Sequence, residues 1–338
     1  METHQVGNLG RGEKMKIGFF TANYLNEPLE KVLDRAAGWG YEAVEIPAFQ
    51  GSPHLDVEMV LRDSSYAQKV KKVVSERGLF ISALSNHPEG QLILGPHGKD
   101  TDAIFAGTPE EKIRFGMERM MKTAQAANAL EVPVVCGFVG CENFGRFFPW
   151  PYSRGWAEME EQFVERWGKV LDAFDRYGVK FAHEPHPNEL VYDVYTAKRS
   201  LELMKDKKSW GFNFDPANLI YLGIDVVNFV QAVGHKIYHV HAKDGEIVEH
   251  NVKRDGLIPT GPWTRIDRGF RFRIPGWGSV PWKRVITELA LVGYDYVLSY
   301  EHEDVTMSRE DGATKTIEFL KPLLIKAPYE GRKDILFQ

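Results

Sequence analysis

The 338-residue chain has only two cysteines, Cys136 and Cys141, and no apolar run of the length that spans a membrane. Two cysteines cannot form a disulfide framework, and these two are not in CxxC spacing, so we interpret both as structural. The first 14 residues are polar and contain no apolar signal-peptide segment. These absences argue against a disulfide-rich secreted protein and an integral membrane protein, and we expect a cytoplasmic location.

Positive charge is not in excess either. The chain has 42 Lys and Arg against 47 Asp and Glu, a formal net charge of −5. Nucleic-acid-binding proteins usually present a basic surface, so the composition favours a small-molecule substrate over a nucleic acid. A homo-oligomer or a small partner subunit remains open.

A glycine-rich phosphate-binding turn is also missing, because the segment after the first expected strand reads TANYLNEP. This disfavours an open nucleotide-binding sheet. Instead, short apolar runs alternate eight times with longer amphipathic segments. The pattern predicts an α/β protein with a single (β/α)8 TIM barrel over residues 15–325, an N-terminal extension (1–14) and a C-terminal tail (326–338). Strands are expected at residues 16–21, 43–46, 80–84, 132–138, 179–184, 210–214, 237–241 and 296–301.

Three strand-to-helix connections are long, namely 85–108, 139–155 and 242–281, after strands 3, 4 and 7. Barrel active sites are built from the loops that follow the strands. The segment FGRFFPWPYSRGW is rich in aromatic residues, in which disordered segments are poor. We therefore expect ordered lids, with Trp150 as a candidate to contact the substrate.

Acidic residues and histidines occur at the ends of strands five to eight, in the motifs FAHEPHP, NFDPAN, HVHAKD and SYEHED. The carboxyl ends of barrel strands converge on one mouth, so these side chains should form a mixed oxygen and nitrogen site. Such a site suits Mn²⁺, Mg²⁺, Co²⁺ or Zn²⁺. For any single residue, a local polar pair is the alternative. Side chains two positions apart along a strand lie on the same face. Glu184 therefore shares a face with His186, His239 with His241, and Glu301 with Glu303.

These motifs resemble those of the sugar phosphate isomerase/epimerase superfamily, the xylose-isomerase-like barrels. That superfamily includes ketose 3-epimerases, inosose isomerases and dehydratases, and endonuclease IV. The segments RIPGWGSVPW and GYDYVLSYEHED look typical of its sugar-processing members. The resemblance implies one divalent metal ion, with Mn²⁺ as first choice, and Glu184 and Glu301 as the catalytic acid/base pair. The implied metal ligands are Glu184, Asp215, His241 and Glu301.

The resemblance implies an isomerase or epimerase of a keto sugar or cyclitol. A carboxylate would remove the proton α to a carbonyl, and the metal would act as a Lewis acid that stabilises the enediolate. The alternative on the same site is a dehydratase or lyase acting on an inosose or a 3-keto-glycoside, as in C-glycoside deglycosidases. The acidic net charge and the single metal site disfavour a DNA-repair endonuclease. The complete ligand set disfavours a non-catalytic barrel.

Further residues at the strand ends are candidates for binding substrate. Asn218 follows Asp215 by three residues, where epimerase relatives place a histidine. Lys243 would hold a substrate oxygen or pair with Asp244. Glu45, at the end of strand two, is a weaker candidate for the site, with a structural ion pair as the alternative. The substrate-binding candidates are His87, His186, Asn218, Lys243, Arg273 and Trp150.

Overall fold

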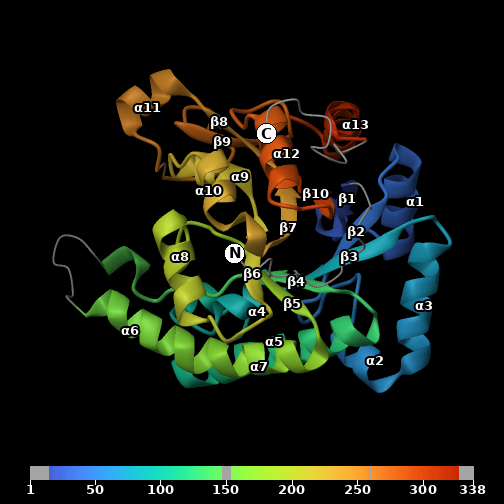
Figure 1. The fold of residues 1–338 in the computed structure, drawn as a ribbon, viewed down its shortest axis with the longest axis vertical. Helices are drawn as coiled ribbons and strands as arrows, with labels where there is room; N and C mark the ends of the chain where they lie inside the picture. Colours follow the sequence, from blue (N-terminus) through green and yellow to red (C-terminus); the bar gives the residue numbers. More distant parts are fainter. Residues whose placement is uncertain (1–14, 147–153, 259, 327–338) are drawn as a thin grey trace, which may run out of the picture.

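The structure, a computed structural model, describes residues 15–146, 154–258 and 260–326 (Figure 1). Eight parallel strands close into a barrel in the order β1-β10-β7-β6-β5-β4-β3-β2, which confirms the predicted fold. The barrel strands are β1 (Lys16–Phe20), β2 (Ala43–Pro47), β3 (Phe80–Ser85), β4 (Val134–Gly137), β5 (Lys180–His183), β6 (Trp210–Phe214), β7 (Ile237–Ala242) and β10 (Val297–Tyr300).

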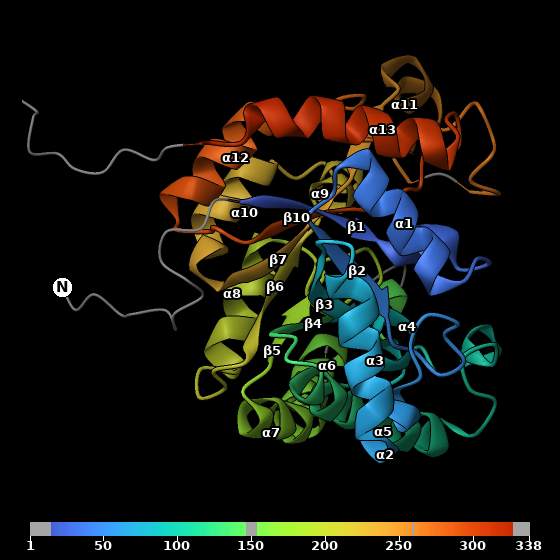
Figure 2. The same cartoon turned by 90° about the vertical axis from the view of Figure 1, so that its right-hand side faces the viewer.

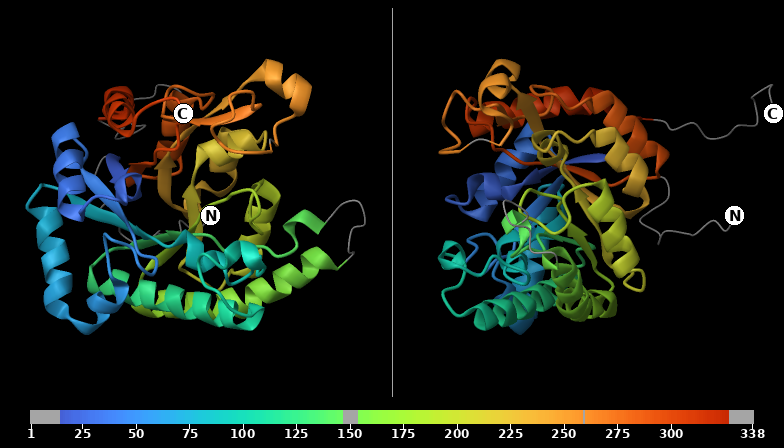
Figure 3. Two further views of the ribbon diagram at one scale, coloured as in Figure 1. Left: turned by 180° about the vertical axis from the view of Figure 1, so that it is seen from behind. Right: turned by 90° about the vertical axis from the view of Figure 1, so that its left-hand side faces the viewer.

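Helices cover the outside of the barrel. In Figures 1 and 2, α5 and α7 lie together on one side and α12 and α13 lie on the opposite side; Figure 3 shows the same arrangement from behind. No helix within the described ranges combines the length and apolarity needed to cross a membrane. The helices are α1 (Leu29–Trp39), α2 (Val57–Arg62), α3 (Ser64–Ser75), α4 (His87–Gln91), α5 (Pro109–Ala129), α6 (Gly155–Gln162), α7 (Gly168–Tyr177), α8 (Val194–Leu203), α9 (Pro216–Tyr221), α10 (Val226–Val233), α11 (Glu249–Asp255), α12 (Trp282–Leu291) and α13 (Arg309–Leu320).

The interface between strands and helices is filled by large aromatic side chains. Trp167 stacks on Phe181 of β5 with ring centroids 4.5 Å apart, and Phe181 stacks in turn on Trp210 of β6 at 5.9 Å. All three are almost fully buried. Burial of such side chains is the main term that stabilises the fold, at roughly 25 cal/mol per Å² of apolar surface.

The sequence pattern predicts one helix over residues 57–77, and this prediction is wrong. The structure has two helices, α2 and α3, separated by Asp63 in an extended conformation with φ −132° and ψ 102°. The Asp63 carboxylate accepts a hydrogen bond from the Ser65 amide at 2.8 Å. A side chain that caps a new helix competes with continuation of the old one, and here the cap prevails.

The long connection after β7 contains an antiparallel hairpin that the sequence pattern does not predict. It is formed by β8 (Asp244–Ile247) and β9 (Phe270–Arg273), and it lies with α11 at the top of Figure 1, beside α9. The buried Asp244 carboxylate accepts hydrogen bonds from the Val280 amide at 3.0 Å and from Trp282 Nε1 at 2.9 Å. These bonds join the start of the connection to its end, beside β7.

Candidate metal centre

Four side chains from consecutive barrel positions meet at the carboxyl ends of the strands. Glu184 follows β5, Asp215 follows β6, His241 lies near the end of β7 and Glu301 follows β10. One possible ligand atom from each lies within 4.8 Å of those from the others. The structure therefore brings together the four residues that the family resemblance implies as metal ligands.

The imidazole of His241 has two different neighbourhoods. Its Nδ1 atom lies 3.0 Å from Glu184 Oε2, 3.2 Å from Glu301 Oε2 and 4.0 Å from Asp215 Oδ2. No well-directed hydrogen bond to this Nδ1 forms within the described part of the chain. Its Nε2 atom points the other way and lies 3.2 Å from both carboxylate oxygens of Glu45. Nδ1 is thus the nitrogen directed at the cluster.

Glu184 is held on both of its carboxylate oxygens. Its Oε2 lies 3.0 Å from His87 Nε2 and accepts a 3.1 Å hydrogen bond from Asn213 Nδ2. Its Oε1 accepts a 2.8 Å hydrogen bond from Asn218 Nδ2. Burial would raise the pKa of Glu184, but His241 and His87 lower it well below its usual value. Glu184 is an anion with a fixed orientation.

Lys243 occupies the other side of the cluster. Its ammonium lies 2.7 Å from Glu301 Oε2 and 2.9 Å from both Glu303 Oε2 and Asp215 Oδ2. Burial would lower the pKa of Lys243, but Asp215, Glu301 and Glu303 raise it well above its usual value. The alternative pairing with Asp244 is not formed, because that carboxylate accepts hydrogen bonds from the connection after β7.

The charges and donor atoms of this cluster fit a divalent cation. Glu184, Asp215 and Glu301 provide three carboxylates in a buried space, and the one ammonium of Lys243 does not balance them. Burial raises the pKa of Asp215 to about 7, even though Lys243 opposes the shift. Two buried atoms, Asp215 Oδ2 and His241 Nδ1, lack a well-directed hydrogen bond from the described residues. A mixed carboxylate and imidazole set suits Mn²⁺, Co²⁺ or Zn²⁺, and Mg²⁺ less well.

The remaining substrate-binding candidates lie at different distances from this centre. The rings of His186 and His87 both contact Phe138, with ring centroids 5.0 Å and 4.7 Å away. Arg273 is engaged elsewhere, with Nε 2.8 Å from Asp304 Oδ2 and Nη1 2.6 Å from Glu246 Oε2. Its role in substrate binding stays a prediction. Trp150 lies outside the described residues, as do residues 1–14 and 327–338 of the expected extension and tail.

Both cysteines are buried and free, as expected of structural thiols. Burial raises the pKa of Cys141 to about 12 and that of Cys136 well above its usual value. Thiols with such raised pKa values are poor nucleophiles at neutral pH. Neither cysteine is a candidate for catalysis.

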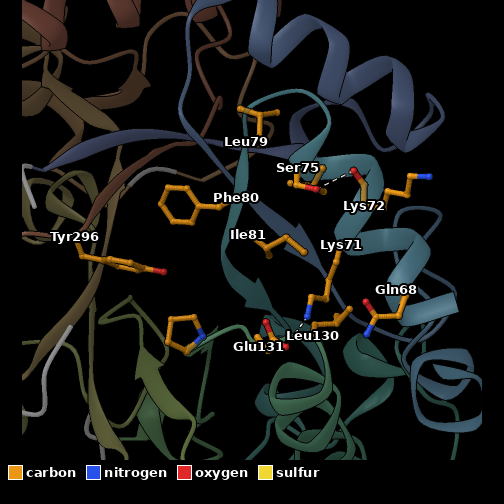
Figure 4. A pocket seen from close by; sticks show the side chains of 12 residues that line it. Gln68, Lys71, Lys72, Ser75, Leu79, Phe80, Ile81, Leu130, Glu131 and Tyr296 are labelled. Carbon is orange, nitrogen blue, oxygen red and sulfur yellow. Dashed lines mark hydrogen bonds and ion pairs between the residues drawn. The ribbon is translucent and has the colours of Figure 1, made fainter. Parts of the chain in front are cut away.

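A separate hollow of about 620 Å³ lies at the opposite end of the barrel (Figure 4). Its walls include Phe80 at the start of β3, Tyr296 just before β10, and Lys71 of α3, which pairs with Glu131. In TIM barrels the amino-terminal end contributes to stability, whereas the chemistry occurs at the carboxyl ends of the strands. We therefore assign no catalytic role to this hollow.

Sequence reasoning missed the contribution of two residues inside the barrel. A structural ion pair is the alternative for Glu45, and Glu45 forms one with His241, but the motifs do not indicate this contact with a candidate ligand. The motifs do not indicate Asn213, whose amide donates a hydrogen bond to Glu184. The available signal was a polar residue in the middle of an apolar strand, in AVEIP and WGFNF. Such residues are buried and therefore need a partner.

The closed barrel and the buried carboxylate and imidazole cluster at its mouth define a TIM-barrel protein with a candidate divalent-metal site. The chain belongs to the family of xylose isomerase-like TIM barrels, whose sequence pattern it matches over residues 33–323. One relative, Uncharacterized protein YfiH of Bacillus subtilis (strain 168), is 26% identical over 329 residues, covering 91% of this chain and 98% of that protein.

Solved structures with the same fold include enzymes of two reaction types. The probable 3-DHS dehydratase AsbF of Bacillus anthracis is 18% identical with a TM-score of 0.63, covering 91% of this chain and 99% of that one. A D-allulose 3-epimerase from Methylomonas sp. is 16% identical with a TM-score of 0.62, covering 92% of this chain and 98% of that one. At these identities the similarity establishes the shared fold.

Proposed function

We propose that this protein is a divalent-metal-dependent isomerase or epimerase of a keto sugar or cyclitol. One observation supports this most strongly: three carboxylates and one imidazole face one another in a buried space at the barrel mouth. An ion held by Glu184, Asp215, His241 and Glu301 would act as a Lewis acid toward the substrate carbonyl. The D-allulose 3-epimerase with the same fold makes a ketose a reasonable substrate class.

The two glutamates would contribute unequally to proton transfer. Glu301 has 19% of its side chain exposed and a hydrogen bond from Lys243 on Oε2. Glu184 is 4% exposed and accepts hydrogen bonds on both oxygens. A carboxylate whose lone pairs are already shared is the weaker base. Glu301, the more exposed of the two, is therefore the better placed group to remove the proton α to the carbonyl. In an epimerase, Glu184 would first have to take up a proton and would then return it on the opposite face.

A dehydratase or lyase is the second candidate, and the position of His87 favours it. His87 Nε2 lies 3.0 Å from Glu184 Oε2, so an imidazole stands beside the carboxylate that is already saturated with hydrogen bonds. An elimination needs one base and one acid that protonates the leaving group, which Glu301 and His87 would supply. The dehydratase from Bacillus anthracis has the same fold.

Isotope exchange distinguishes these two reactions. The purified protein, loaded with Mn²⁺, is incubated in D₂O with a panel of ketoses, inososes and 3-keto-glycosides. Deuterium incorporation at the carbon next to the carbonyl without loss of a group indicates isomerisation or epimerisation, whereas release of water or an aglycone indicates elimination. Glu301→Gln should abolish both, and exposed Glu42→Gln provides the matched control. Full exchange by Glu301→Gln would remove Glu301 from the proposed role.

A further inference from the structure

Glu45 lies inside the barrel, below the mouth, and its side chain is fully buried. It is part of β2, and its two carboxylate oxygens both face His241 Nε2 at 3.2 Å. Ser299 of β10 donates a 2.8 Å hydrogen bond to Glu45 Oε2. Glu45 therefore links three barrel strands, although it offers no atom to the cluster of four at the mouth.

This contact decides which nitrogen of His241 carries a proton when the ring is neutral. A neutral imidazole has one N–H donor and one lone pair, and a carboxylate can only accept. With Nε2 between two carboxylate oxygens, the proton belongs on Nε2 and the lone pair on Nδ1. Nδ1 is the atom directed at Glu184 and Glu301.

The plane of the ring is fixed as well. Phe20 of β1 stacks on His241, with ring centroids 5.7 Å apart and an interplanar angle of 26°. The stacking leaves the imidazole little freedom to tilt, and the Glu45 contact opposes a flip that would exchange Nδ1 and Nε2. The ring is held before any ligand arrives.

We infer that Glu45 is a positioning residue that presents the Nδ1 lone pair of His241 to a divalent metal ion. This rests on the proposed function, because it assumes that an ion binds at the mouth. Ligating histidines commonly give their other N–H to a carboxylate, and removing such a partner typically lowers metal affinity 10–100-fold. The carboxylate also makes the imidazole a stronger donor to the ion.

Glu45, His239 and His241 are themselves close enough to be considered as metal ligands. Their present contacts argue for the positioning role. His239 Nδ1 lies 3.2 Å from Asn213 Oδ1, and Glu45 is bonded to Ser299. An ion on Nε2 of His241 as well as on Nδ1 would require the ring to lose both protons, a cost that a positioning carboxylate avoids.

Mn²⁺ titration of the metal-free full-length chain, with free ion followed by electron paramagnetic resonance, tests the inference. Wild type is expected to bind one ion, and Glu45→Gln to bind one ion 10–100-fold more weakly. Exposed Glu42→Gln is the matched control and should bind as wild type does. Ser299→Ala removes the hydrogen bond to Glu45 Oε2 and leaves the backbone pairing of residue 299 with His241 in place. It should show a smaller loss, and it covers the case in which Glu45→Gln fails to fold.

A second readout separates positioning from general damage to the fold. Co²⁺ bound to Glu45→Gln should show altered d–d absorption, while the metal-free variant keeps the near-ultraviolet circular dichroism of wild type. Unchanged Mn²⁺ affinity and an unchanged Co²⁺ spectrum in Glu45→Gln would overturn this inference but leave the proposed function standing. Two ions in wild type, one of them lost in Glu45→Gln, would overturn it by making Glu45 a ligand. A wild type that binds no ion overturns the proposed function itself.

Discussion

The ammonium of Lys243 lies 2.7 Å from Oε2 of Glu301, so a buried cation shares an oxygen with the candidate metal site. Lys243 also approaches Asp215, a second candidate ligand, at 2.9 Å. The lysine therefore neutralises part of the negative charge of the site and at the same time repels an incoming ion. Removing the charge of Lys243 should therefore lower the stability of the protein and strengthen its binding of the metal ion.

Lys243→Met should lower the stability of the metal-free protein and raise its affinity for the metal ion. Removing one partner of a buried ion pair costs about 3–5 kcal/mol, because the other charge stays buried. Loss of the like charge should strengthen Mn²⁺ binding about tenfold. Thermal unfolding with and without Mn²⁺ measures both, with exposed Lys253→Met as control. Weaker metal binding by Lys243→Met would show that the lysine organises the ligands and does not compete with the ion.

Metal affinity should rise steeply as the pH rises through neutrality. Burial raises the pKa of Asp215 to about 7, and the Glu45, Glu184 and Glu301 carboxylates raise that of His241 well above its usual value, against the effect of burial. Both ligands must lose a proton to bind an ion. Below pH 7, the apparent Kd should therefore fall at least about tenfold for each unit by which the pH rises. Calorimetry between pH 6 and 8 measures this; a Kd independent of pH contradicts it.

His87→Gln should separate the two candidate reactions. The imidazole beside Glu184 is the proposed acid in an elimination, and loss of a general acid typically slows a step 10²–10⁴-fold. In a lyase, release of the leaving group should fall by that factor while deuterium exchange next to the carbonyl persists. Exposed His250→Gln is the control. If elimination proceeds at the wild-type rate in His87→Gln, another group is the acid.

Glu189 should make the protein less stable as the pH rises. It is buried after β5, and its Oε2 accepts hydrogen bonds from the amides of Val139 and Gly140 at 2.8 and 2.6 Å. Burial raises its pKa from 4.5 to about 8. The folded chain keeps this proton when the unfolded chain has lost it, so its contribution is complete below about pH 4.5 and is lost as the pH rises to about 8.

Glu189→Gln tests that contribution, because it keeps an oxygen for the two amides and cannot ionise. Urea unfolding at pH 5 and pH 8.5 measures the free energy of unfolding of the variant and of wild type. From the lower to the higher pH, the difference between them should change by about 1–3 kcal/mol in favour of the variant. Exposed Glu202→Gln should show no such change. An equal difference at both pH values would mean that Glu189 titrates alike in the folded and unfolded chains.

The alternation of short strands with amphipathic helices predicts the fold, whereas the family resemblance implies the four cluster residues. Alternation along a strand and the convergence of strand ends placed Glu184 and His241 at one mouth. The contacts among them needed the closed barrel, since only strand order brings Glu45 of β2 to His241 of β7 and Lys243 to Glu301. Pairings between residues about 60 to 200 positions apart leave no local signal.

Two local features also escaped prediction, for different physical reasons. The break at Asp63 depends on one side-chain hydrogen bond that outweighs a continuous helical pattern. The strands β8 and β9 are short and are separated by a long connection, so the sequence contains no tight-turn motif that would predict their pairing. Arg273, predicted to bind substrate, forms ion pairs with Glu246 of the neighbouring strand β8 and with Asp304, which follows β10.

The metal content of the purified chain tests the central claim most directly. Elemental analysis after reloading and desalting should find one divalent ion per wild-type chain and per exposed His250→Ala chain, and almost none in His241→Ala. That result follows if His241 Nδ1 faces the three carboxylates in order to bind an ion. One ion per chain in His241→Ala, or none in wild type, would contradict the account.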